Sequence, residues 1–134
     1  MKRQILLLED EPLILMDLEF AAQDLGCTAL LASSLEEALT RIADHKDTLS
    51  AAVLDVSLGE GHNCFAVAQE LDRLGIPFIL HSGDLDRHDE QVRELDAKLI
   101  SKPAPSDEVI AAAIAAAGSS APSDACDTER LPAD

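Results

Sequence analysis

Four short apolar runs in this sequence lead into polar residues that are suited to metal and phosphate chemistry. Glu9 and Asp10 follow the first run, Asp55 the second and Lys102 the fourth, while Ser82 comes just after the third. Short apolar runs that alternate with helix-like segments are typical of buried parallel strands. Functional groups of an open parallel α/β sheet gather beyond the carboxyl ends of its strands, so we expect these five side chains to meet at one edge. Three carboxylates, a hydroxyl and an ammonium suit a divalent cation together with a phosphoryl group.

Asp55 argues most strongly for such a site. It follows Ala51–Leu54 directly, so its carboxylate lies at the rim of a buried sheet, where lost hydration is unfavourable unless another charge compensates. A hard cation between Asp10 and Asp55 would compensate, because Mg²⁺ binds one or two carboxylates together with waters and phosphate oxygens. Each of the other residues alone could be a solvated turn residue. Their coincidence at four strand ends favours the site.

Composition excludes several classes of function. The 134 residues predict a single domain with a sizeable core. The formal charge is −16 with only ten Lys and Arg residues, so we expect no direct nucleic-acid partner. We expect no membrane partner either, because no apolar stretch is long enough to cross a bilayer and the N-terminus lacks a signal peptide. The three cysteines lie far apart and indicate neither a disulfide framework nor a zinc site. A cytoplasmic protein is expected.

The spacing of apolar residues predicts five strands alternating with helices, which is an α/β sandwich. The expected strands are Gln4–Leu8, Thr28–Ala32, Ala51–Leu54, Pro77–Leu80 and Ala97–Ile100. The expected helices are Pro12–Leu25, Leu35–His45, Cys64–Leu74 and Asp107–Ala117, with a weakly apolar one near residues 86–95. Residues 118–134 have almost nothing to bury and predict a disordered polar tail.

Residue types at the helix ends agree with these boundaries. Ser34 and Glu37 predict a capping box, in which the two side chains satisfy free backbone amides. Gly75 falls just after a helix end, where a left-handed residue is favoured. The apolar stripes of the first two helices include Leu25 and Leu39, which we expect to face the core.

The four strand-end motifs together resemble the response-regulator receiver family of two-component signalling. The matching segments are ILLLEDEP, AAVLDVSLGEG, ILHSG and LISKP, and the resemblance spans residues 4–117. It implies a flavodoxin-like, doubly wound, five-stranded parallel sheet in the order 2-1-3-4-5, with helices on both faces. It also implies a receiver domain over residues 1–117 and a role in bacterial phosphorelay signalling, not that of an enzyme with turnover.

The resemblance implies roles for the acidic residues. Asp55 is similar to the phospho-acceptor, whose carboxylate attacks a phosphohistidine. Asp10 resembles a direct ligand of Mg²⁺ (or Mn²⁺), and Glu9 one that acts through water. Asp55 and the backbone carbonyl of Ser57 would complete the metal site.

The resemblance extends to the third and fourth sites. Ser82 and Lys102 are similar to the phosphate-sensing hydroxyl and the phosphate-binding lysine of receivers. The Lys102–Pro103 bond resembles the family's cis peptide. The sequence departs from the family at Leu99, where receivers commonly carry an aromatic switch residue. His81 is expected to be a half-buried strand residue that faces away from Ser82.

The implied partners are a histidine kinase or histidine phosphotransfer protein and an unknown downstream protein. Seventeen residues follow Ala117, too few for an output domain, so we expect signalling through partner proteins. Leu15 and Met16, beside the core stripe of the first helix, either suit docking of a kinase's helical phosphohistidine domain or belong to a wider buried face.

Three other functions are alternatives to that of a phospho-acceptor. Leu99 leaves open a receiver-like interaction module that works without phosphorylation. An aspartate-nucleophile phosphatase would need a second carboxylate where Ser57 stands. A nucleotide or flavin binder would need a glycine-rich loop after the first strand.

Overall fold

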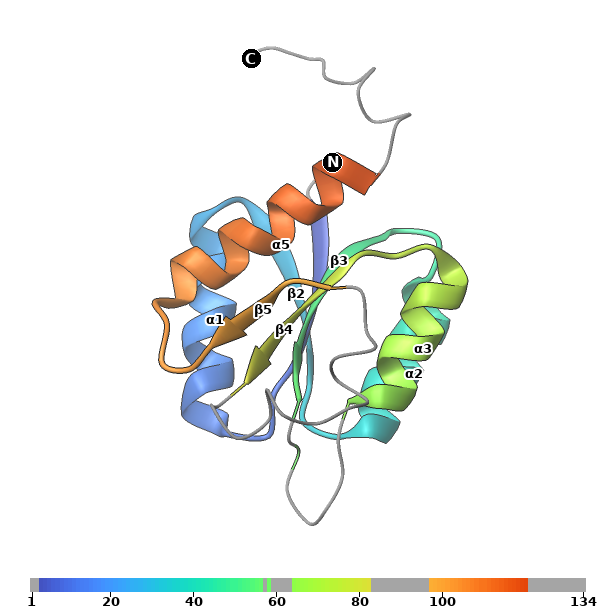
Figure 1. Ribbon diagram of the computed structural model, residues 1–134, viewed down its shortest axis with the longest axis horizontal. Helices are drawn as coiled ribbons and strands as arrows, with labels where there is room; N and C mark the ends of the chain where they lie inside the picture. The colour runs from blue at the N-terminus through green and yellow to red at the C-terminus, as the bar shows by residue number, and fades with distance from the viewer. Residues whose placement is uncertain (1–2, 57, 59–63, 83–96, 121–134) are drawn as a thin grey trace.

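Five parallel strands form one sheet in the order β2-β1-β3-β4-β5, as the resemblance implied. The computed structural model describes residues 3–56, 58, 64–82 and 97–120. The strands are β1 Arg3–Leu8, β2 Cys27–Ala32, β3 Leu49–Asp55, β4 Phe78–Ser82 and β5 Leu99–Ser101 (Figure 1). The helices are α1 Pro12–Asp24, α2 Leu35–His45, α3 Phe65–Leu74 and α5 Ser106–Ser120. Ser57, the weak helix expected near residues 86–95 and residues 121–134 of the expected tail lie outside the described residues.

Helices cover both faces of the sheet, and each face has its own apolar cluster (Figure 1). Ile5 and Leu7 of β1 join the cluster beneath α1 and α5, whereas Leu6 and Leu8 join the cluster beneath α2 and α3. This alternation follows from the two-residue period of a strand. With both faces covered, the central strands are almost entirely buried. Side chains at their carboxyl ends are therefore held by a rigid base.

Most boundaries differ from the expected ones by one to three residues, and four differences bear on the site or the core. Asp55 and Ser82 are the last residues of β3 and β4 and do not lie beyond them. Leu25 is 45% exposed because α1 ends at Asp24, so Leu25 no longer follows the helical period. Leu39 is 38% exposed. The last helix continues to Ser120, three residues past the expected end at Ala117.

The helix ends show how the chain enters and leaves the sheet. The Ser34 hydroxyl accepts a hydrogen bond from the Glu37 amide at 3.2 Å, as expected of a cap. The Glu37 carboxylate, however, accepts from the amide of Ser33 at 2.8 Å and not from that of Ser34, so the capping box is shifted by one residue. Gly75 adopts φ +74°, the left-handed conformation predicted for it. Pro12 begins α1 at its first turn, directly after the acidic segment.

Candidate functional site

Glu9, Asp10 and Asp55 form an acidic cluster at the carboxyl edge of the sheet. One carboxylate oxygen of each lies within 4.8 Å of the others. The cluster forms because β1 and β3 are paired, with Leu8 opposite Leu54, so the residues that follow are neighbours. The Glu9 amide donates to the carbonyl of Ala32 at 3.1 Å, which fixes the end of β1 against β2. Glu9 and Asp55 are buried, whereas Asp10 is exposed.

Lys102 places an ammonium group against both buried carboxylates. Its Nζ lies 3.2 Å from Glu9 Oε1 and 3.2 Å from Asp55 Oδ1. The Lys102 amide donates to the carbonyl of Ser82 at 2.7 Å, which joins the end of β5 to the end of β4. The Lys102–Pro103 peptide is cis, as the resemblance implied. The lysine thus reaches across β4 to contact the acidic cluster.

Burial and like charges shift the protonation of these groups. Desolvation, followed by the neighbouring Glu9 carboxylate, raises the pKa of Asp55 to about 8, although Lys102 acts in the opposite direction. Burial alone would lower the pKa of Lys102, but the carboxylates of Asp55 and Glu9 outweigh it and raise that pKa. The ammonium therefore stays charged, while the acidic cluster holds more negative charge than one lysine can balance.

The charges and free oxygens of the acidic cluster fit a divalent cation. When Asp55 is ionised, the three carboxylates and the ammonium leave two negative charges, which one dication would neutralise. Glu9 Oε1 is buried and lies 3.2 Å from the Lys102 ammonium, but within the described residues it accepts no hydrogen bond, so it keeps a lone pair for a ligand. Clustered carboxylate oxygens, here with the exposed Asp10 among them, are the donors that Mg²⁺ prefers. Glu9, Asp10 and Asp55 would hold such an ion.

The structure brings most of the predicted site residues together. Glu9, Asp10, Asp55 and Lys102 are in mutual proximity. Ser82 is buried at the end of β4, and its carbonyl contacts the backbone of Lys102. Ser57 lies outside the described residues.

His81 is a feature whose full burial the sequence did not predict. It faces away from Ser82 as expected, because it lies on the same face of β4 as Ile79, beneath α1 and α5, but it is 3% exposed and not half-buried. Within the part of the chain that the structure describes, neither ring nitrogen has a hydrogen-bond partner. Burial, and then the charge of Lys102, lower the pKa of His81 to about 4. Pairing with Asp55 on one side and Ile100 on the other explains the burial.

We expect His81→Leu to stabilise the protein by about 1–3 kcal/mol, because the change removes a buried polar group without a partner and keeps a similar volume. The gain should increase below pH 6.5. There the imidazole of the unfolded chain takes up a proton that the folded chain refuses until about pH 4, so the wild type loses stability as pH falls. Urea unfolding of both proteins at pH 5 and 7 measures this. A variant less stable than wild type at both values would contradict it.

Several solved structures have the same fold as this chain. No protein-family model and no curated protein matches the sequence. SdrG from Sphingomonas melonis Fr1 is 35% identical with a TM-score of 0.71, and the match covers 87% of this chain and 96% of SdrG. A response regulator receiver protein from Sinorhizobium medicae WSM419 is 21% identical with a TM-score of 0.78, covering 90% of this chain and 98% of that protein.

A third structure, the receiver domain of NtrX from Brucella abortus, is 24% identical with a TM-score of 0.73 and covers 87% of this chain and 99% of that domain. This chain belongs to the response-regulator receiver family. The strand order and the acidic cluster facing a lysine agree with that membership. As a receiver domain, the chain has the fold of a phosphorelay response regulator in general. Within the described segments, no helix is both long and apolar enough to cross a membrane.

Proposed function

We propose that the domain accepts a phosphoryl group on Asp55 from a histidine kinase or histidine phosphotransfer protein. The observation that supports this most directly is the position of Lys102 Nζ, 3.2 Å from both Glu9 Oε1 and Asp55 Oδ1. A phosphoryl group on Asp55 would bring negative oxygens to the position where this ammonium already lies. A preorganised cation of this kind stabilises the charge that develops during phosphoryl transfer.

Each residue has a part in the proposed reaction. An oxygen of the Asp55 carboxylate attacks phosphorus, a P–O bond forms, and the P–N bond of the phosphohistidine breaks. Lys102 leaves its carboxylate partners and pairs with a phosphoryl oxygen. The Ser82 hydroxyl donates to another oxygen. A Mg²⁺ or Mn²⁺ ion held by Glu9, Asp10, Asp55 and the Ser57 carbonyl would neutralise further phosphoryl charge. The domain acts as an acceptor and signals through partner proteins.

Incubation with acetyl phosphate or phosphoramidate and Mg²⁺ tests the proposal. We expect one acid-labile adduct, detected as a mass increase of one phosphoryl group. The adduct should be absent from Asp55→Asn and from wild type with EDTA. Asp47→Asn, a change at an exposed aspartate before β3, is the matched control and should leave the adduct intact. An adduct that persists in Asp55→Asn would contradict the assignment. Absence of any adduct would favour the interaction module that works without phosphorylation.

An exposed apolar stripe on α1 offers a surface for the donor. Leu13, Met16 and Phe20 are 74%, 44% and 55% exposed, and their spacing places them on one side of the helix. The sequence suggested Leu15 and Met16 as docking residues. Met16 is exposed, whereas Leu15 packs against the core under α1 and α5. Because α1 begins two residues after Asp10, the stripe lies next to the acidic edge. We propose that it packs against the helices of the donor domain.

We expect Phe20→Ser to slow phosphoryl transfer from a cognate phosphohistidine protein at least about tenfold, since an apolar anchor at an interface commonly contributes more than 1.4 kcal/mol. Acetyl phosphate needs no such docking, so its reaction rate should stay unchanged. Leu39→Ser removes an exposed apolar side chain from α2, on the other side of the sheet, and serves as the control. Equal slowing with acetyl phosphate and with the protein donor would place the defect in the site and not in the docking surface.

A further inference from the structure

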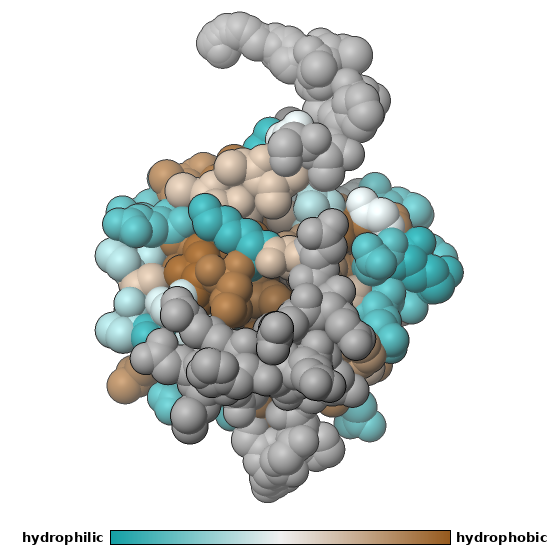
Figure 2. All heavy atoms as spheres, viewed as in Figure 1, coloured by the Kyte–Doolittle hydropathy of each residue, from teal (hydrophilic) through white to brown (hydrophobic). Residues whose placement is uncertain are grey.

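An apolar groove of about 610 Å³ lies at the β4–β5 edge of the sheet, at the end of β4 opposite to the acidic cluster. Its floor includes Phe78 and Ile79, the first residues of β4, and one wall is formed by Ala112, Ala115 and Ala116 of α5. Figure 2 shows the beige, alanine-rich surface of α5 on this face of the molecule, with a band of teal, hydrophilic surface between it and the brown, more strongly apolar surface. The groove is large enough for a few side chains of a peptide.

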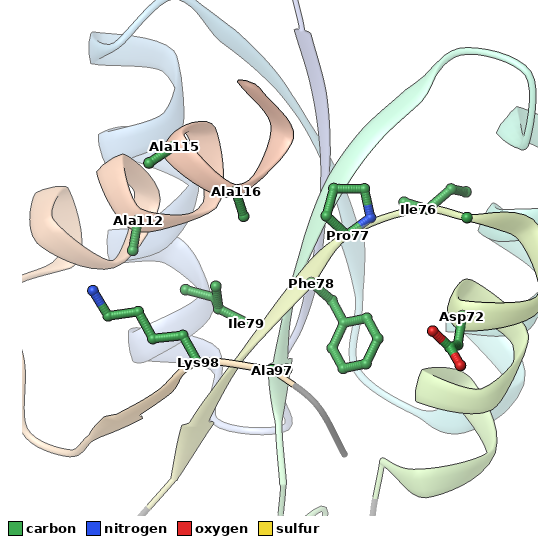
Figure 3. Close-up of a pocket in the computed structure, with 11 residues that line it drawn as sticks. Asp72, Ile76, Pro77, Phe78, Ile79, Ala97, Lys98, Ala112, Ala115 and Ala116 are labelled. Atoms are coloured by element: carbon green, nitrogen blue, oxygen red, sulfur yellow. The ribbon is translucent and has the colours of Figure 1, made fainter. Parts of the chain in front are cut away.

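The groove is open for two reasons. β5 first pairs with β4 at Leu80, so among the described residues no strand pairs with Phe78 on its outer side. The alanines of α5 have side chains too short to fill the space between the helix and this strand (Figure 3). Apolar side chains that remain in contact with water at a concave site favour an apolar occupant.

We propose that the groove is the docking site of the chain's own C-terminal segment, residues 121–134, with Leu131 as the anchor. The proposal does not depend on the phosphoryl-acceptor function. Leu131 is the only large apolar side chain after α5. The segment leaves α5 at Ser120, four residues after Ala116, so it starts about 6 Å along the helix from the alanine wall. The anchor is therefore tethered next to its site.

The length of the tether suits this contact. Leu131 is the eleventh residue after Ser120, and a flexible chain of that length spans roughly 17–20 Å on average. The groove begins well within that distance. A tether of this kind gives an effective concentration in the millimolar range, so even a small apolar contact is populated. A second copy of the protein at micromolar concentration lacks this advantage.

The charges at the two sides of the groove match those beside Leu131. Figure 3 shows Lys98 on the side of α5 and Asp72 on the side of α3, with Phe78 between them. In the segment, Glu129 and Arg130 directly precede Leu131. Glu129 can pair with Lys98 and Arg130 with Asp72. Because the chain carries a formal charge of −16, Arg130 is one of few basic groups able to meet an acidic residue here.

A spin label on Cys126 tests the proposal in the full-length chain. Cys27 and Cys64 are buried, so Cys126 is the thiol within the segment open to labelling. We expect the label to broaden the amide resonances of Lys98, Ala112 and Ala115. The broadening should be lost in Leu131→Ser and kept in Ala133→Ser, a matched change that spares the anchor. Broadening of these amides that is equal in wild type and Leu131→Ser overturns the proposal.

One further measurement tests the pairing of Arg130 with Asp72, and another tests whether the segment docks within one chain or between two copies. Arg130→Asp should reduce the broadening, and the added change Asp72→Arg should restore it; no restoration would overturn the pairing of these two residues. Mixing isotope-labelled protein that carries no spin label with spin-labelled protein at natural abundance detects contacts between copies. We expect no broadening in the mixture. Broadening of the same amides there would mean that a second copy occupies the groove, and would overturn docking within one chain.

Discussion

Replacing Lys102 with Met is expected to lower the free energy of unfolding of the metal-free protein by about 3–5 kcal/mol above pH 8, where Asp55 is ionised. The Lys102 ammonium lies 3.2 Å from two carboxylates, Glu9 and Asp55, whose side chains are only 1% and 3% exposed. Removing it leaves those charges buried without a compensating cation. The Met side chain retains most of the apolar stem of the lysine. The decrease in the free energy of unfolding therefore arises from the lost charge and not from lost packing. Urea unfolding in EDTA measures it.

Lys98→Met provides the control for this change, because Lys98 lies four residues earlier and is exposed at the surface. It should change the free energy of unfolding by less than about 0.5 kcal/mol. Saturating Mg²⁺ should return a large part of the stability lost by Lys102→Met, since a dication at the acidic cluster compensates the same charges. Phosphorylation by acetyl phosphate should nevertheless remain about 10²-fold slower, because the phosphoryl oxygens have lost their ammonium. Equal stabilities of wild type and Lys102→Met in EDTA would refute the electrostatic account of the site.

Much of the fold could be predicted from local patterns. Apolar runs and punctuating residues located all five strands, and the bounds of Leu35–His45 were predicted without error. The pattern could not determine which apolar residues at the periphery of the core are buried. Leu25 and Leu39 are apolar and in phase with the core, yet they are exposed. Burial of such residues depends on where a helix ends and what packs beside it, and both are properties of the tertiary structure.

The positions of the site residues were predicted because strand ends converge in any parallel α/β sheet. That rule placed Glu9, Asp10, Asp55 and Lys102 at one edge, but it could not give the contacts between them. The shared ion pair of Lys102 depends on side-chain geometry. The full burial of His81 depends on its neighbours in β3 and β5. The groove beside Phe78 arises because β5 is short, which a count of apolar residues does not reveal.

The second large effect concerns pH, and its sign follows from the raised pKa of Asp55. The pKa is raised from 3.8 to about 8 in the metal-free fold, first by desolvation and then by Glu9. The folded state therefore binds this proton more tightly than the unfolded chain. The stability that this proton contributes is fully present below about pH 4 and is lost as pH rises towards 8. Each unit of this shift corresponds to about 1.4 kcal/mol, so Asp55→Asn should stabilise the metal-free protein at pH 8 by at least that amount.

The window from pH 6.5 to 8 isolates the contribution of Asp55. Below pH 6.5, the lowered pKa of His81 makes stability change in the opposite direction, because the unfolded imidazole gains a proton that the buried one does not. We therefore expect the stability of the metal-free wild type to fall between pH 6.5 and 8, and that of Asp55→Asn to fall much less. Saturating Mg²⁺ should abolish the fall, since a cation beside the carboxylate replaces the proton as its compensating charge. A wild-type slope that is the same with Mg²⁺ and with EDTA would show that Asp55 neither holds this proton nor shares its site with the ion.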